Sequence, residues 1–155
     1  MWWSRRGFLA VLGAAGCGFA PAEGPGAPGA ALRGAVIVDE PDSRDGFTFV
    51  AAIEDRLGRP AAPRFCLAWG VTTEPVPGGI TATGATTRFT LTGRATYRLT
   101  EGDRVLAEGA VESFTGWFAT STTVAAAAAE ADARRRLMAM LADRVVARLY
   151  AALAA

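Results

Sequence analysis

The pattern that most constrains the fold is a strict alternation of residue types between residues 86 and 99. One set of alternate positions holds apolar or small residues: Phe89, Leu91, Gly93, Ala95, Tyr97 and Leu99. The other set holds only arginine and threonine: Arg88, Thr90, Thr92, Arg94, Thr96 and Arg98. Because side chains of a β-strand point alternately to its two faces, this segment predicts a strand with one covered and one polar face. Such a strand is typical of an antiparallel sheet.

A second strand is expected directly after the turn Glu101-Gly102-Asp103. Its predicted inner residues are Val105, Ala107, Gly109, Val111 and Ser113, and its outer face carries Arg104, Glu108 and Glu112. Pairing Leu99 with Val105 and Tyr97 with Ala107 keeps the two inner faces together, whereas a slip of one residue would not. In this register Arg94 lies diagonal to Glu108 and Glu112, within reach of a long side chain.

Two more strands are expected before this hairpin. One covers residues 65–73, where large apolar and small residues alternate, and it should end at the breakers Pro75, Pro77, Gly78 and Gly79. The other is the apolar run within residues 32–38. Cys66 lies in the first of these strands, and we expect it to be a small, buried apolar residue.

Two helices complete the expected fold. The first covers residues 43–57, with Asp42 or Ser43 as a possible N-cap and Gly58 in its stop signal. The second runs from Ser121 or Thr122 to about Leu153, and its apolar stripe comprises Val124, Ala127, Ala131, Met138, Leu141, Val145, Leu149 and Ala152. The order β-α-β-β-β-α predicts an α+β two-layer sandwich, in which a four-stranded, mainly antiparallel sheet has both helices on one face.

The N-terminus reads as a lipoprotein signal. Arg5 and Arg6 precede a short apolar stretch that ends in Ala14-Ala15-Gly16-Cys17. This stretch is shorter than the roughly 20 residues that a membrane-spanning helix needs. We therefore expect a signal peptide over residues 1–16, acylation of Cys17 with fatty acids such as palmitate, a flexible Gly- and Pro-rich tether over 17–31, and a folded domain over 32–155. Twin-arginine and general secretory export both remain open.

The composition excludes several functions. The chain has 16 basic and 15 acidic residues, so no strong basic excess suggests a nucleic-acid partner. It contains no histidine, and all its basic residues are arginine. Without an imidazole there is no histidine base for a nucleophile and no histidine metal ligand. We therefore predict no catalytic residue, no metal and no cofactor.

Several segments, in this order, resemble the lipopolysaccharide-assembly lipoprotein family LptE in its alphaproteobacterial form. The resemblance begins at the lipidation signal with Cys17-Gly18-Phe19, Pro21 and Gly24, although Ala22 and Glu23 depart from the family pattern. It is strongest over residues 86–93 and at Tyr97-Arg98-Leu99. The other matching segments are Asp45-Gly46-Phe47, Leu57-Gly58-Arg59, Ser113-Phe114, residues 130–133, residues 141–144 and Arg148-Leu149.

The resemblance implies a non-enzymatic protein at the periplasmic face of the outer membrane. Family members plug the barrel LptD, help to assemble it and help to deliver lipopolysaccharide to the outer leaflet. The phosphates of lipopolysaccharide need cationic partners, and arginine suits them. Our candidates are Arg88, Arg94 and Arg98 on the polar strand face, and then the run Arg134, Arg135 and Arg136.

Simpler interpretations exist for both arginine groups. The strand arginines can pair with Glu108 and Glu112, and the helix arginines can form a solvated face balanced by Glu130 and Asp132. For the whole chain, the alternative is an unrelated outer-membrane lipoprotein that binds a small ligand or a cell-wall component. That alternative predicts a closed pocket lined by the apolar strand faces.

Overall fold

The computed structural model describes residues 28–80, 86–119 and 122–154 of the chain. The elements, in chain order, are a 3₁₀ helix η1 (Pro28–Leu32), β1 (Val36–Val38), α1 (Arg44–Leu57), β2 (Phe65–Ile80), β3 (Thr86–Glu101), β4 (Arg104–Phe118) and α2 (Thr123–Ala154). The signal peptide, Cys17 and residues 17–27 of the predicted tether lie outside the described residues. The predicted α+β fold is confirmed.

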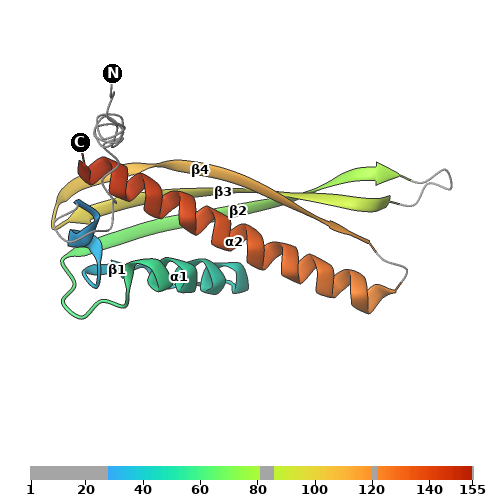
Figure 1. Cartoon of the computed structure of the whole chain (residues 1–155), viewed down its shortest axis with the longest axis horizontal. Coiled ribbons are helices and arrows are strands. Elements are labelled where there is room, and N and C mark those ends of the chain that lie inside the picture. The colour runs from blue at the N-terminus through green and yellow to red at the C-terminus, as the bar shows by residue number, and fades with distance from the viewer. Residues whose placement is uncertain (1–27, 81–85, 120–121, 155) are drawn as a thin grey trace, which may run out of the picture.

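The four strands form one sheet in the order β1-β2-β3-β4. Strand β1 runs parallel to β2, and the other neighbours are antiparallel. Both helices lie on the same face of the sheet, and the strands β2 and β3 extend beyond α1 (Figure 1). We call the covered face the inner face and the other the outer face. The described residues therefore form a two-layer sandwich in which they leave one sheet face bare.

Helix α1 begins and ends where the sequence predicts. The side-chain oxygen of Ser43 accepts a hydrogen bond from the backbone N–H of Gly46 at 3.1 Å, so Ser43 is the N-cap. Asp45 lies in the first turn, where a negative charge is favourable. At the other end Gly58 has a φ of 77°, a conformation that glycine adopts without strain. Its N–H caps the carbonyl of Glu54.

Strand β2 is longer than predicted, because the prolines do not break it. Phe65 donates its N–H to Ala35, and the carbonyl of Leu67 accepts from Asp39, so odd-numbered β2 residues direct their backbone groups toward the β1 side. By this alternation Pro75 and Pro77 lack only an N–H that would point away from β3. Strand β1 pairs only with Phe65–Leu67, so this edge is open at both prolines. The ladder to β3 therefore continues to Ile80.

The predicted register of the β3–β4 hairpin was wrong by two residues. Leu99 pairs with Ala107 and Tyr97 with Gly109, while Arg94 pairs directly with Glu112. The register shifts beyond Leu99, where Thr100 pairs with Val105. This irregularity follows a tighter turn than expected. The two-residue shift keeps the same residues on each face, whereas the irregularity beyond Leu99 places Val105 opposite Thr100 on the outer face, where Val105 is 46% exposed.

Cys66 is exposed, contrary to the prediction that it is buried. It belongs to the alternate set of β2 residues that faces the bare side of the sheet, while its neighbours Phe65 and Leu67 are buried. The predicted strand over residues 32–38 is also shorter than expected. Its first residue, Leu32, ends η1 and is fully buried, and β1 begins only at Val36.

Helix α2 begins after Thr122, whose hydroxyl accepts a hydrogen bond from the N–H of Ala125 at 3.4 Å. Of the predicted stripe, the buried residues are Met138, Leu141, Val145 and Leu149, whereas Val124 is 80% exposed and Ala152 is exposed. The stripe missed five further buried residues, which complete two rows at i,i+4 spacing: Ala133, Leu137, Ala142, Val146 and Tyr150. Two rows are buried because α2 packs against both α1 and the sheet.

Candidate functional site

The outer face of the sheet carries two cross-strand ion pairs. Arg94 donates to Glu112 at 2.5 Å, and Arg98 lies 3.0 Å from Glu108. All four side chains are more than half exposed. Exposed pairs of this kind contribute only about 0–1 kcal/mol to stability. Arg94 and Arg98 therefore pair with the glutamates of the next strand, as the simpler interpretation predicts.

Arg88 differs from the other two strand arginines in its surroundings. Its guanidinium lies 5.8 Å from the ring centre of Phe118, which is a cation–π distance. Phe118 and Phe114 stand on the outer face of β4 and are 66% and 69% exposed. Among the described residues, no carboxylate forms an ion pair with Arg88. A cation beside exposed aromatic rings suits a ligand that is partly anionic and partly apolar.

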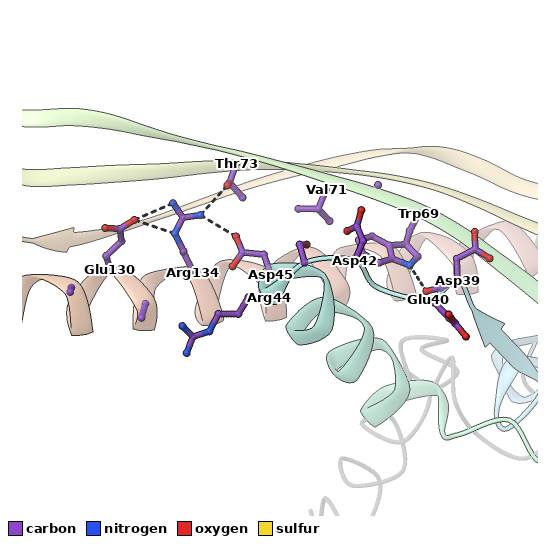
Figure 2. Close-up of a pocket in the computed structure, with 14 residues that line it drawn as sticks. Asp39, Glu40, Asp42, Arg44, Asp45, Trp69, Val71, Thr73, Glu130 and Arg134 are labelled. Atoms are coloured by element: carbon purple, nitrogen blue, oxygen red, sulfur yellow. Dashed lines mark hydrogen bonds and ion pairs between the residues drawn. The ribbon is translucent and has the colours of Figure 1, made fainter.

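Arg134 connects three elements on the inner side of the molecule. Its guanidinium donates to Asp45 of α1 at 3.0 Å, to Thr73 of β2 at 3.2 Å and to Glu130 of α2 at 3.1 Å (Figure 2). Burial by itself would lower the pKa of Arg134, but hydrogen bonds and charge attraction from Glu130 and Asp45 outweigh it and raise the pKa above its ordinary value. Arg134 thus stays charged and holds α1, β2 and α2 together.

The other two helix arginines hold local contacts. Arg135 donates to Asp132 at 2.9 Å, one turn earlier on the same helix. Arg136 also pairs with Asp132, and it donates to the backbone carbonyl of Gly116 at 3.1 Å. The run therefore ties α2 to itself and to β4. Asp132 balances Arg135 and Arg136, and Glu130 balances Arg134. These pairs match the simpler interpretation, in which the helix arginines form a face balanced by acidic residues.

The six predicted arginines do not form one site. Arg88, Arg94 and Arg98 lie on the outer face, whereas Arg134, Arg135 and Arg136 lie on α2, behind the sheet. The sequence did not indicate that Asp45 meets Arg134, because 89 residues separate them. The exposure of Phe114 and Phe118 had a signal in the sequence, since both occupy the same alternate positions as Glu108 and Glu112.

A cleft of about 810 Å³ opens between the start of α1, strand β2 and helix α2. Asp39, Glu40 and Asp42 line one end, beside Trp69, whose indole N–H donates to the carbonyl of Asp39 at 2.9 Å (Figure 2). The contacts of Arg134 occupy the other end. The cleft is thus lined by carboxylates and Arg134 together with Trp69 and Val71 from the inner face of β2, so it is of mixed character and not purely apolar.

Two findings limit the chemistry of the described part of the chain. Within residues 28–80, 86–119 and 122–154, no group of three histidine, cysteine or acidic residues is placed to hold a metal ion. Among the helices of these ranges, none combines the length and the apolar character that crossing a membrane requires.

The fold is that of small bacterial lipoproteins. The chain is similar to a candidate lipoprotein from Caulobacter crescentus, with a TM-score of 0.68 and 20% identity, over 82% of this chain and 96% of that one. It is also similar to rare lipoprotein B from Shewanella oneidensis, with a TM-score of 0.59 and 9% identity, over 76% and 92% of the two chains. None of the curated proteins compared with the chain matches it significantly.

The family follows from the sequence. The model of the LptE family, described as lipopolysaccharide-assembly, matches residues 34–149 of the 155. The chain therefore belongs to the LptE family of lipopolysaccharide-assembly lipoproteins. This family is non-enzymatic and associated with the outer membrane.

Proposed function

We propose that this chain is a lipid-anchored plug and assembly factor for the outer-membrane barrel LptD, and that it helps to deliver lipopolysaccharide to the outer leaflet. The observation that carries the proposal is the family match, which begins before β1 and ends within α2. The shape supports it as well. The sheet is long, and its outer face is bare, so the domain presents a continuous surface that a barrel lumen could enclose (Figure 1).

The anchor belongs to the same proposal. Acylation of Cys17 would hold the protein at the periplasmic face of the outer membrane, with residues 18–27 between the lipid and η1. A mature lipoprotein carries more than one fatty-acid chain, which binds it stably to the membrane, whereas a single chain gives only marginal membrane binding. This arrangement leaves the folded domain free to enter a barrel in the same membrane.

For contact with lipopolysaccharide we propose Arg88 first among the six predicted arginines. Its cation lies beside Phe118, and Phe114 lies four residues along β4 on the same outer face, so this surface offers both charge for a phosphate and apolar area for an acyl chain. Arg94 and Arg98 are next, because they lie on the same face but are already paired with glutamates. Arg134, Arg135 and Arg136 are last, because their carboxylate contacts hold α2.

The barrel proposal is tested by photo-crosslinking in intact cells. A photoreactive residue at position 112 on the outer face is compared with one at position 51, an exposed position of α1. We expect position 112 to trap LptD. Recovery of the unaltered protein from gently solubilised membranes as a free monomer, with neither position trapping a barrel, would refute the proposal.

The ligand proposal is tested with purified full-length protein and labelled lipopolysaccharide. We expect Arg88→Glu to weaken binding more than Arg94→Asp combined with Arg98→Asp, because the latter two cations already have carboxylate partners. The matched control is Arg59→Glu, an exposed change of equal charge in the segment between α1 and β2. Equal binding by Arg88→Glu and the control would remove Arg88 from the site.

A further inference from the structure

The outer edge of β4 is an open edge of the sheet. Strand β4 is last in the strand order, so β3 is its one neighbour among the described strands. In an antiparallel pair, successive residues direct their backbone groups alternately toward and away from the partner strand. The carbonyl of Gly116 accepts from the Arg136 side chain, so even-numbered residues of the regular ladder point away from β3. The edge from Glu108 to Phe114 therefore presents backbone N–H and C=O groups in alternation.

A groove runs beside this edge. It has a volume of about 410 Å³ and is lined by Ala110, Val111 and Glu112 of β4 and by Arg144, Ala147 and Arg148 of α2, with the side chain of Arg94 at its outer rim. Arg144 and Arg148 are exposed and one helical turn apart. Within the described residues, neither forms an ion pair with a carboxylate. The groove thus combines open strand edge with two uncompensated positive charges.

We propose that this groove binds an extended, acidic segment of a partner protein, which adds to β4 as a fifth strand. Backbone groups of such a segment would pair with the open edge, the usual mode of strand addition. Its alternate side chains would then point toward α2, where acidic residues would meet Arg144 and Arg148. The side chains between them would point to the outer face, where Glu112 already has Arg94 as its partner. The recognised pattern is therefore an acidic residue at every second position.

The backbone favours a polypeptide over a lipid phosphate as the occupant. A phosphate only accepts hydrogen bonds, so it could use the N–H groups at the edge but not the carbonyls between them. An extended chain satisfies both kinds of group. The added strand ends naturally at Gly116, because Arg136 already occupies that carbonyl.

Two other occupants are disfavoured by charge. If a second copy paired through its own β4, its Glu108 and Glu112 would remain on the outer face, and Arg144 and Arg148 of the two copies would come together as like charges. The segment of this chain before Pro28 has only one acidic residue, Glu23, so it cannot supply the alternating pattern. The site does not depend on the barrel proposal, and either can fail without the other.

The test uses the full-length chain in detergent and a short fluorescent peptide of alternating threonine and glutamate. We expect saturable binding that weakens as salt is raised, because the charges are exposed. Arg144→Glu combined with Arg148→Glu should weaken binding by about tenfold or more, because attraction becomes repulsion. The matched control is Arg59→Glu combined with Arg104→Glu, which makes the same change of charge away from the groove.

A second variant tests the backbone. Ala110→Pro removes an N–H from the open edge but none from the ladder to β3, so it should fold and bind the peptide weakly. Ala110→Val keeps the N–H and should bind like the unaltered chain. A peptide of the same composition with its glutamates in adjacent pairs should bind less well than the alternating one.

Three results would overturn the proposal. The first is equal peptide binding by the Arg144 and Arg148 double variant and its control. The second is equal binding of the alternating and paired peptides. The third is lipopolysaccharide binding that this double variant loses while the unaltered chain binds no peptide, which would assign the groove to a lipid headgroup.

Discussion

The two ends of the sheet are built from the same strands but differ in burial. At the hairpin end, near the turn at Gly102, the fully buried residues include Leu32, Leu99 and Leu149. At the open end, where β2 and β4 finish and β3 begins, Phe114 and Phe118 are 69% and 66% exposed. The α2 residue Val124, near that end, is 80% exposed. Large apolar residues occur at both ends, so their presence does not decide burial.

Coverage by the helices decides it. Helix α1 begins at Arg44, beside the contacts of Arg134 with Asp45 and Thr73, and from there it runs toward the hairpin end (Figure 1). The hairpin end is therefore covered by two helices and the open end by the first part of α2 alone. Neither described helix, α1 or α2, lies over the outer face at either end. We infer that the hairpin end supplies most of the stability, while the open end keeps surface for recognition.

The largest expected effect is a difference in the free energy of unfolding between alanine substitutions of two phenylalanines, one at each end. Phe49 is fully buried against Trp69, with ring centres 5.1 Å apart, and Phe49→Ala should lower the free energy of unfolding by about 3–5 kcal/mol. Phe118→Ala at the open end should change it by less than about 0.5 kcal/mol, because the ring is mostly exposed. Urea denaturation of both variants measures the difference. Similar losses would mean that the two ends share the core.

Next is a comparison of two glycines. A Cβ at Gly93 would lie 2.8 Å from Leu137 and 3.1 Å from Leu141, both fully buried, so Gly93→Val should cost about 1–3 kcal/mol through overpacking. At Gly78, on the outer face of the open end, the nearest atom is 3.6 Å away, and Gly78→Val should be close to neutral. Thermal unfolding of the two variants provides the measurement. A stable Gly93→Val would show that α2 can move away from the sheet.

Much of the fold could be predicted from local patterns. The alternation in residues 86–99 indicated the covered and bare faces of β3, and Ser43 and Gly58 marked the ends of α1, because these signals act through neighbouring residues. The helix α2 was predicted, but only half of its buried surface. A single apolar stripe is expected for a helix that packs against one neighbour, but α2 packs against both α1 and the sheet.

The remaining errors have non-local causes. Cys66 alternates correctly with its neighbours, but no pattern within β2 tells which face the helices cover. The sequence predicts that the prolines end β2, because it does not show that β1 is short and leaves that edge open. The candidate site was predicted only in part: six arginines were named, but the position of Arg144 and Arg148 beside the β4 edge depends on how α2 crosses the sheet. Their one available signal was an i,i+4 pair of cations without an acidic residue one turn away.

A smaller effect is expected where the two ends meet. Arg134→Met removes the contacts to Asp45, Thr73 and Glu130 and should destabilise the protein by about 1 kcal/mol, a value reduced by partial exposure to solvent. Arg135→Met loses only a contact within α2 and should change stability by less than about 0.5 kcal/mol. Hydrogen exchange should show faster opening of the first turns of α2 in Arg134→Met alone. Equal exchange in both variants would mean that Arg134 does not connect the two ends.

The smallest effect on stability is expected from the prolines of the open end. Pro75→Thr combined with Pro77→Thr adds two N–H groups to the free edge of β2 and breaks no ladder bond, so the free energy of unfolding should stay within about 0.5 kcal/mol. The restored donors make that edge a better template for another strand, so size-exclusion chromatography should show more self-association. The control is Thr72→Pro, at a position whose N–H points toward β3, and it should destabilise strongly. If the double variant unfolded as readily as Thr72→Pro, the backbone alternation along β2 would be the reverse of the one that the contacts of Phe65 and Leu67 indicate.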